Sequence, residues 1–84
     1  MKKTTKVMNV LTEEIHTFYN GHDLETNLIS AIIYSSEDRR KLLEYKYRTS
    51  IRNEAKIEYI NSKNGSVKVY SPSYDMIAYL DNQN

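Results

Sequence analysis

The chain has 84 residues, no cysteine and a formal net charge of +1 at pH 7. The lack of cysteine excludes disulfides, thiolate metal sites and thiol nucleophiles, and it is typical of proteins from a reducing compartment. A charge this close to zero does not by itself indicate a nucleic-acid-binding protein. The length predicts one domain, 1–84, and no segment has the apolar run of a signal peptide or a membrane span. We therefore expect a cytoplasmic protein that makes no contact with membranes.

The first predicted element is a helix between Thr12 and Gly21. Thr12 can accept a hydrogen bond as an N-cap, two acids follow it in the first turn, and Gly21 provides a stop. Three apolar side chains fall on one side of this helix: Ile15, Phe18 and Tyr19. Residues 6–10 upstream fit either an extension of the helix or a short strand, and the pattern does not separate the two.

Two interpretations fit residues 27–36, NLISAIIYSS. A helix opened by Asp23 would place Leu24, Leu28 and Ile32 on one face. A strand would be apolar on both faces, so it would need cover on both sides of its sheet, which one short helix cannot supply. The cover would then come from a C-terminal helix, from a second copy of the chain in a homodimer, or from a different protein.

Residues 43–52 alternate between two kinds of side chain. Charged or polar residues separate five others at every second position: Leu43, Tyr45, Tyr47, Thr49 and Ile51. Strict alternation favours a strand. A spacing of four also fits part of the segment, and residues 36–38 have the composition of a helix cap, so period two and period four coincide here. We prefer the strand for both 27–36 and 43–52, with a turn at 37–40 that joins these two strands and a second turn at 52–54.

Residues 55–71 carry the strongest local signal, which is that of a β-hairpin. An Asn-Gly pair, which tolerates positive φ, lies between two runs that alternate apolar and polar residues. A loop of three residues pairs Tyr59 with Val69 and Asn61 with Val67, and it gathers the apolar side chains on one face. A two-residue turn would leave both faces mixed, so we predict the three-residue loop with Gly65 in the left-handed position.

After the hairpin, Pro72 ends the sheet because it cannot donate to a ladder, and Ser73 has the character of a helix cap. The predicted fold is therefore α+β, with an N-terminal helix, an antiparallel β-meander of three to four strands that ends in the 55–71 hairpin, and a short C-terminal helix. If both middle segments are helices instead, the order becomes three helices and a hairpin. That order resembles a winged-helix DNA-binding domain, with the hairpin loop as the wing tip.

No group of residues predicts a catalytic, cofactor or metal site. His16 and His22 are the two histidines of the chain, which is too few for the ligand set of a metal-dependent hydrolase. Glu13 and Glu14 would point about 100° apart on a helix, so they suit the first turn better than a shared substrate. With no cysteine and no glycine-rich phosphate loop, the chain is not expected to be an enzyme.

Positive charge is concentrated in one segment. Seven cations and two acids give residues 39–56 a net charge of +5, which leaves −4 for the rest of the chain. On the strand interpretation, the outer face of the sheet carries five residues that we predict to bind a partner: Lys46, Arg48, Arg52, Lys68 and Tyr70. Arg and Tyr dominate binding hot spots. The competing interpretation is an ordinary solvated sheet face.

Two functions compete at this point. The first is a small non-enzymatic protein that binds another protein, as regulators and inhibitors carried by phages and mobile elements do. The alternative is a nucleic-acid-binding regulator, winged-helix-like, that uses the basic 39–56 segment. Binding to nucleic acid would weaken steeply with salt, whereas binding to a protein need not. The sequence also predicts that reversing the charges of Arg48 and Arg52 leaves folding intact and removes activity.

Overall fold

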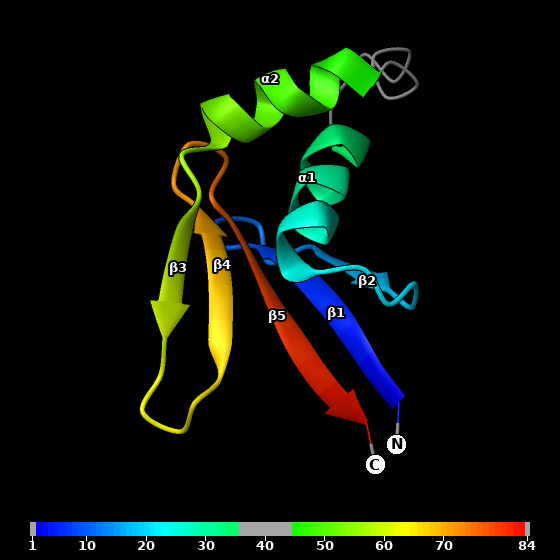
Figure 1. Ribbon diagram of the computed structural model, residues 1–84, viewed down its shortest axis with the longest axis vertical. Coiled ribbons are helices and arrows are strands. Elements are labelled where there is room, and N and C mark those ends of the chain that lie inside the picture. Colours follow the sequence, from blue (N-terminus) through cyan, green and yellow to red (C-terminus); the bar gives the residue numbers. More distant parts are fainter. Residues whose placement is uncertain (1, 36–44, 84) are drawn as a thin grey trace.

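The computed structural model describes residues 2–35 and 45–83, and the side chains of 4–35 and 48–81. Within these residues the fold is α+β, as predicted, with two helices and a five-stranded antiparallel sheet in the order β2-β1-β5-β4-β3 (Figure 1). The elements in chain order are β1 (Lys2–Asn9), β2 (Ile15–Phe18), α1 (Leu24–Tyr34), α2 (Tyr45–Ala55), β3 (Glu58–Asn61), β4 (Val67–Ser71) and β5 (Met76–Gln83).

The two ends of the chain form the centre of the sheet. β1 pairs with β5 along its whole length, from Lys2 opposite Gln83 to Asn9 opposite Met76. The termini therefore lie side by side (Figure 1). β2 adds to the outer side of β1, and the β3–β4 hairpin adds to the outer side of β5.

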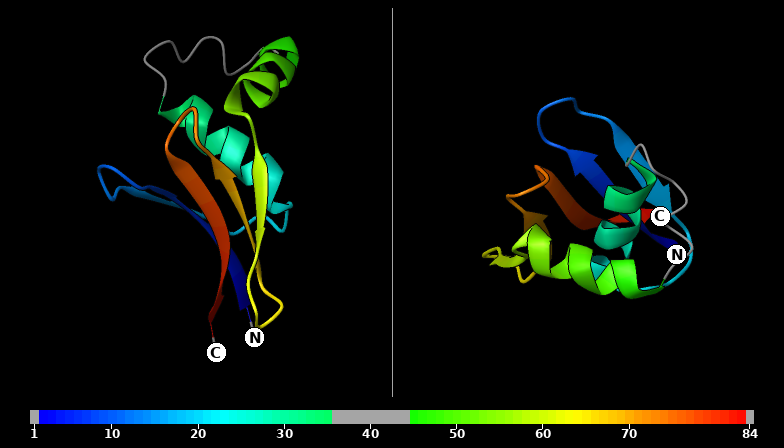
Figure 2. Two further views of the ribbon diagram at one scale, coloured as in Figure 1. Left: turned by 90° about the vertical axis from the view of Figure 1, so that its left-hand side faces the viewer. Right: turned by 90° about the horizontal axis from the view of Figure 1, so that it is seen from above.

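Both helices lie on the same side of the sheet (Figures 1 and 2). α1 packs against the centre of the sheet and buries Leu28 and Ile32 against Val7, Val69 and Ala78. Burial of each such aliphatic side chain contributes about 1.5–3 kcal/mol to the hydrophobic term, so this layer stabilises the fold. The opposite side of the sheet has no helix among the described residues.

The strand preferred for residues 27–36 is wrong, because Leu24–Tyr34 form α1, the helix that the alternative interpretation gave. Asp23 is its N-cap, and its carboxylate accepts a hydrogen bond of 2.8 Å from the Thr26 N–H. Ile29 and Ile33, on another side of the helix, are also buried. Burial on more than one side explains why the apolar pattern of this segment resembled a buried strand.

The predicted β-hairpin is confirmed together with its register. Tyr59 pairs with Val69 and Asn61 with Val67. The loop has three residues, because the Ser62 N–H donates to the Ser66 carbonyl at 2.9 Å. Gly65 has φ +88°, the left-handed conformation that the sequence required of it.

The predicted N-terminal helix between Thr12 and Gly21 is wrong, because this segment holds the turn between β1 and β2, β2 itself and the residues after it. The side-chain oxygen of Asn9 accepts hydrogen bonds from the N–H groups of Leu11 and Thr12, which closes a turn where a helix was expected to start. Glu13 has φ +66°. Polar residues that can cap a helix can equally stabilise a turn, and pairing with β1 decides between them. Residues 6–9, left open by the sequence, belong to β1.

The predicted strand over 43–52 and the turn at 52–54 are also wrong, because residues 45–55 form α2. Ala55 is buried in the core and Ile51 packs against it, as the spacing of four allowed. The predicted turn at 37–40 lies outside the described residues. The winged-helix order is not found either, since two strands precede the first described helix.

The predicted C-terminal helix is wrong as well, since its residues form β5. Ser71 ends β4, as expected before Pro72, but its hydroxyl then accepts a hydrogen bond from the Tyr74 N–H at 3.3 Å. Asp75, with φ +56°, completes a tight turn that returns the chain antiparallel to β4. Pairing with both β1 and β4 overrides the local capping signal of Ser73.

Candidate functional site

The uncovered side of the sheet is the candidate functional surface, and we call it the open face. Because side chains alternate along a strand, the register assigns every second residue to this face. Its side chains form two rows across the five strands, Ile15, Met8, Ile77, Tyr70 and Glu58 in one row and Thr17, Lys6, Tyr79, Lys68 and Ile60 in the next.

The centre of the open face is apolar and aromatic. Met8, Ile77 and Tyr70 are adjacent in one row and half-buried, with Tyr79 beside them. The surface continues to Ile15 on β2, which is 50% exposed, and to Ile60 on β3, which is 41% exposed. Single exposed apolar side chains are ordinary, but a contiguous patch across a sheet is typical of a surface that binds a partner.

Charges of both signs surround this centre. Lys6 and Asp81 form an ion pair of 2.9 Å between β1 and β5, and the hydrogen bond to Asp81 raises the pKa of Lys6. The Lys68 ammonium lies 5.8 Å from the centre of the Tyr79 ring. With Glu58 the described open face carries two cations and two acids, so it is close to neutral.

The five residues predicted to bind a partner do not form one surface. Lys68 and Tyr70 lie on the open face, where Tyr70 is part of the apolar centre. Lys46, Arg48 and Arg52 belong to α2, on the helix side of the sheet. Lys46 is placed by its backbone, and its side chain lies outside the described ones. The predicted grouping failed because it depended on residues 43–52 being a strand.

The two α2 arginines contact α1. Arg48 donates hydrogen bonds of 3.1 Å to the Thr26 carbonyl and to the Ser30 hydroxyl. Arg52 forms a 3.0 Å ion pair with Glu25, which also accepts a hydrogen bond from the Tyr59 hydroxyl. That bond raises the pKa of Tyr59. These contacts join α2 and β3 to α1, which is a structural role.

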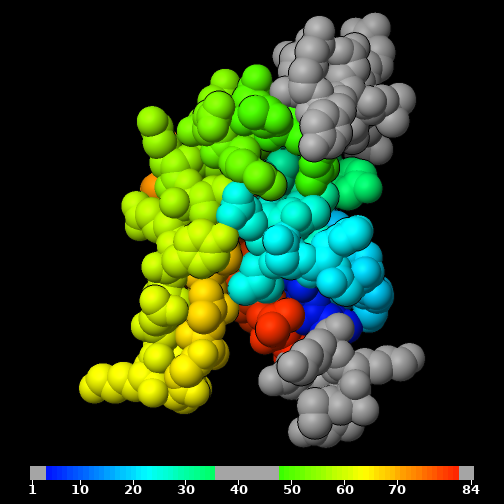
Figure 3. Space-filling model, viewed as in Figure 1, coloured from blue at the N-terminus to red at the C-terminus, as the bar shows by residue number. Residues whose placement is uncertain are grey.

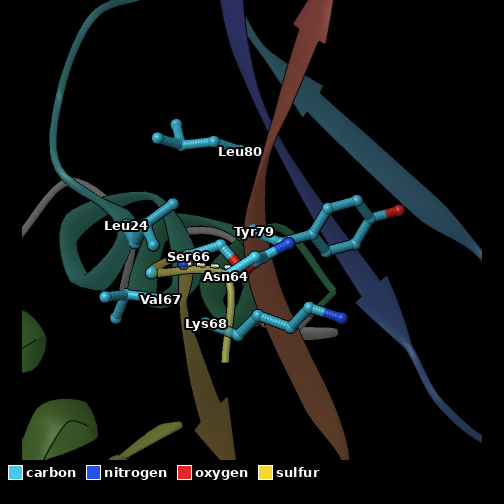
Figure 4. A pocket seen from close by; sticks show the side chains of 8 residues that line it. Leu24, Asn64, Ser66, Val67, Lys68, Tyr79 and Leu80 are labelled. Carbon is cyan, nitrogen blue, oxygen red and sulfur yellow. Dashed lines mark hydrogen bonds between the residues drawn. The ribbon is translucent and has the colours of Figure 1, made fainter. Parts of the chain in front are cut away.

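A groove borders the open face between β4 and β5. Its volume is about 540 Å³, and it is lined by Leu24, Asn64, Gly65, Ser66, Val67, Lys68, Tyr79 and Leu80. In the space-filling view the end of the yellow hairpin stands away from the red β5 strand and leaves a notch (Figure 3). The side chains of Leu24, Val67 and Leu80 lie on one side of the groove, and those of Lys68 and Tyr79 on the other (Figure 4).

Sequence reasoning missed Met8, Ile77 and Tyr79. Segment 76–80, MIAYL, is apolar at every position, because Met76 and Ala78 face α1 while the residues between them form the open face. A run without alternation could have been interpreted as a strand apolar on both faces. The cap-like Ser73 upstream led to a helix instead.

The described residues contain no group of three or more side chains suited to bind a metal ion. Among them, no buried side-chain nitrogen or oxygen lacks a hydrogen-bond partner. The buried Asn27, for example, donates to Asn20 and to the His22 carbonyl, so this polar cluster holds the start of α1 in place. No helix within 2–35 and 45–83 has the length and apolar character needed to cross a membrane.

Comparison of the chain with protein-family models, with curated proteins and with solved structures gave no match.

Proposed function

We propose that this protein is a small non-enzymatic regulator or inhibitor that acts by binding another protein through the open face. The observation that supports the proposal most is the position of Met8, Ile77 and Tyr70, which lie in one apolar row on a sheet face that no described helix covers. A rigid sheet that presents aromatic and aliphatic side chains loses little conformational entropy on binding, because these side chains are already held.

The charges favour a protein over a nucleic acid as the partner. A surface that binds a phosphate backbone needs an excess of cations, whereas the described open face is nearly neutral and Lys6 is already paired with Asp81. The arginines expected to contact phosphates, Arg48 and Arg52, bind α1 instead. A protein interface fits better, since its core is apolar and its rim is polar.

The test compares two variants with the same change in charge. Ile60→Lys with Tyr70→Lys alters the open face, whereas Leu11→Lys with Tyr34→Lys alters exposed positions in the β1–β2 turn and at the end of α1, at 74% and 55% exposure. A partner captured from the native cells by the unaltered protein is purified, and its affinity for each form is measured by calorimetry. Losing one hot-spot residue costs about 2 kcal/mol or more, so we expect the open-face variant to bind at least about 30-fold more weakly. The control variant should bind normally.

Equal affinity of a folded open-face variant and the unaltered protein for this partner would contradict the proposal. So would sedimentation of the protein as a homodimer that the open-face changes dissociate, because a second copy would then occupy the face. Binding of the unaltered protein to duplex DNA with a steep salt dependence, with no face-dependent protein partner, would favour the nucleic-acid alternative.

A further inference from the structure

The pairing between β4 and β5 stops partway along the strands. It joins Ser71 to Met76, Tyr70 to Ile77 and Val69 to Ala78, and no further pair follows in the described residues. β4 begins two residues before Val69, and β5 continues for five residues after Ala78. Figure 1 shows the two strands diverging from this point toward the hairpin loop. The groove occupies the space between them.

The next residues on both strands direct their main-chain groups into this groove. In an antiparallel sheet, successive residues present their N–H and C=O groups to alternate neighbours. The Val10 N–H donates to the Asp75 carbonyl, so odd-numbered residues of β5 face β1 and Leu80 faces β4. The Ser62 N–H donates to the Ser66 carbonyl, so even-numbered residues of β4 face β3 and Val67 faces β5.

Val67 and Leu80 are therefore the positions that would extend the ladder, and they do not pair with each other. Each presents an N–H and a C=O toward a groove of about 540 Å³, a size within the range of about 300–1,000 Å³ that is common for ligand sites. Two divergent strand edges with unused main-chain groups form a template for an additional strand.

The walls of the groove define the chemistry of such a strand. On the helix side lie Leu24, Val67 and Leu80, and the last two are 38% and 49% exposed (Figure 4). On the open-face side lie Lys68 and Tyr79, and the Lys68 ammonium lies over the ring of Tyr79. The side chains of an added strand alternate between these two sides. Apolar residues suit the first side, and carboxylates suit the cation on the second.

We propose that the groove between β4 and β5 binds an extended segment of the partner protein, with alternating apolar and acidic residues, as an added β-strand. This inference rests on the proposed function, because the groove opens beside Tyr79 on the open face. Main-chain hydrogen bonds to Val67 and Leu80 supply affinity that does not depend on sequence. The two walls supply the preference for alternating residues.

The test uses two synthetic octapeptides with blocked ends, one of alternating valine and glutamate and one of alternating valine and lysine. Each is titrated into the isotope-labelled protein and followed by amide chemical shifts and amide hydrogen exchange. We expect the glutamate peptide to bind with a Kd tighter than about 1 mM and to slow the exchange of the Val67 and Leu80 amides. Slower exchange at these two amides reports strand addition, which contacts through side chains alone would not produce.

Charge reversal in the protein sharpens the test. Lys68→Glu should weaken the glutamate peptide about three- to tenfold and favour the lysine peptide, because a single exposed ion pair contributes about 0.2–1 kcal/mol and the reversal adds repulsion. Lys56→Glu, at an exposed position after α2, is the matched control and should change neither affinity.

Three results would overturn the inference. They are the absence of binding by the glutamate peptide, equal binding of both peptides, and binding that leaves the Val67 and Leu80 amides unprotected. These results are distinct from a failure of the proposed function. One such outcome is a partner that loses affinity for the Ile60→Lys, Tyr70→Lys variant and still binds Lys68→Glu normally. That result would support the open face as the binding surface and exclude the groove as part of it.

Discussion

The two sides of β5 differ in what they contact, although they belong to one strand. Met76 and Ala78 point toward α1 and are buried, whereas Ile77 and Tyr79 between them form part of the open face. The first pair contributes to the core of the protein. The second pair consists of an aliphatic and an aromatic side chain, and no described helix covers it. This difference in cover is the reason why we propose the open face as the surface that binds a partner.

The largest expected effect comes from the helix side. Leu28→Ala removes a fully buried side chain of α1, and we expect the free energy of unfolding to fall by about 2–5 kcal/mol, measured by urea denaturation. Ile60→Ala on the open face is the matched change, and we expect it to cost less than about 1 kcal/mol because Ile60 is already 41% exposed. Similar losses for the two variants would contradict the comparison.

The second effect concerns α2. Arg48→Glu with Arg52→Glu breaks the bonds of Arg48 to α1 and places a second carboxylate near Glu25. We expect a loss of about 2–4 kcal/mol in the free energy of unfolding, since one hydrogen bond to a charged group contributes about 1.5–3 kcal/mol. The sequence predicted that this variant folds normally. The contacts of both arginines with α1 lead us to expect a less stable protein instead.

Lys56→Glu provides the control for the α2 variant, because it reverses one charge just after α2 at an exposed position. Its free energy of unfolding should stay within about 0.5 kcal/mol of the unaltered protein. If the double arginine variant is as stable as this control, the arginines do not hold α2 in place, and they become available for a partner.

A smaller effect is expected at the start of α1. Asp23→Ala removes the N-cap and should cost about 1 kcal/mol at neutral pH. Hydrogen bonds from Thr26, through its side chain and then its backbone N–H, lower the pKa of Asp23 below its ordinary value of 3.8. The contribution of the carboxylate is therefore fully present above pH 3.8 and is lost as the pH falls through the lower pKa of the folded state.

Urea denaturation at a series of acidic pH values checks this dependence. The stability difference between the unaltered protein and Asp23→Ala should shrink as the pH falls below 3.8. A difference that stays constant through this range would show that the carboxylate charge does not stabilise the helix.

The smallest effect concerns Lys56, the residue after α2, which has φ +55°. Lys56→Gly should raise the free energy of unfolding by about 0.5–1 kcal/mol, because glycine adopts this left-handed conformation without the cost of a Cβ atom. Thermal unfolding measures the gain. Gly65→Ala introduces a Cβ atom at a position with φ +88° and should lower the free energy of unfolding. The melting temperature should therefore rise for Lys56→Gly and fall for Gly65→Ala.

Features set by nearby residues could be predicted from the sequence. The hairpin register followed from Asn64-Gly65 and the alternation around it. Asp23 was recognised as a possible helix opening, but the helix remained the second interpretation because the apolar residues of 27–36 fitted a buried strand as well. Features set by distant residues could not. β5 is a strand because Met76 to Gln83 pair with β1 at the other end of the chain, and no local signal reports that pairing.

The candidate site residues also fall into a group that the sequence placed correctly and a group that it did not. Lys68 and Tyr70 lie on the open face because the hairpin register was predictable, whereas Lys46, Arg48 and Arg52 were assigned to this face by the alternation of 43–52. That alternation also fits a helix whose every fourth residue is apolar. In the structure the segment is a helix, and Arg48 contacts α1. Sequence periodicity carries no information about such contacts between distant residues.

The most direct measurement is the response of side-chain methyl signals to a soluble paramagnetic probe, recorded by NMR on the isolated protein. If the open face is uncovered, the methyl groups of Ile60 and Ile77 should relax strongly, and those of Val69 and Ala78, on the helix side of the same sheet, should be nearly unaffected. Equal protection of all four would show that the isolated protein already covers this face, and the central claim would be wrong.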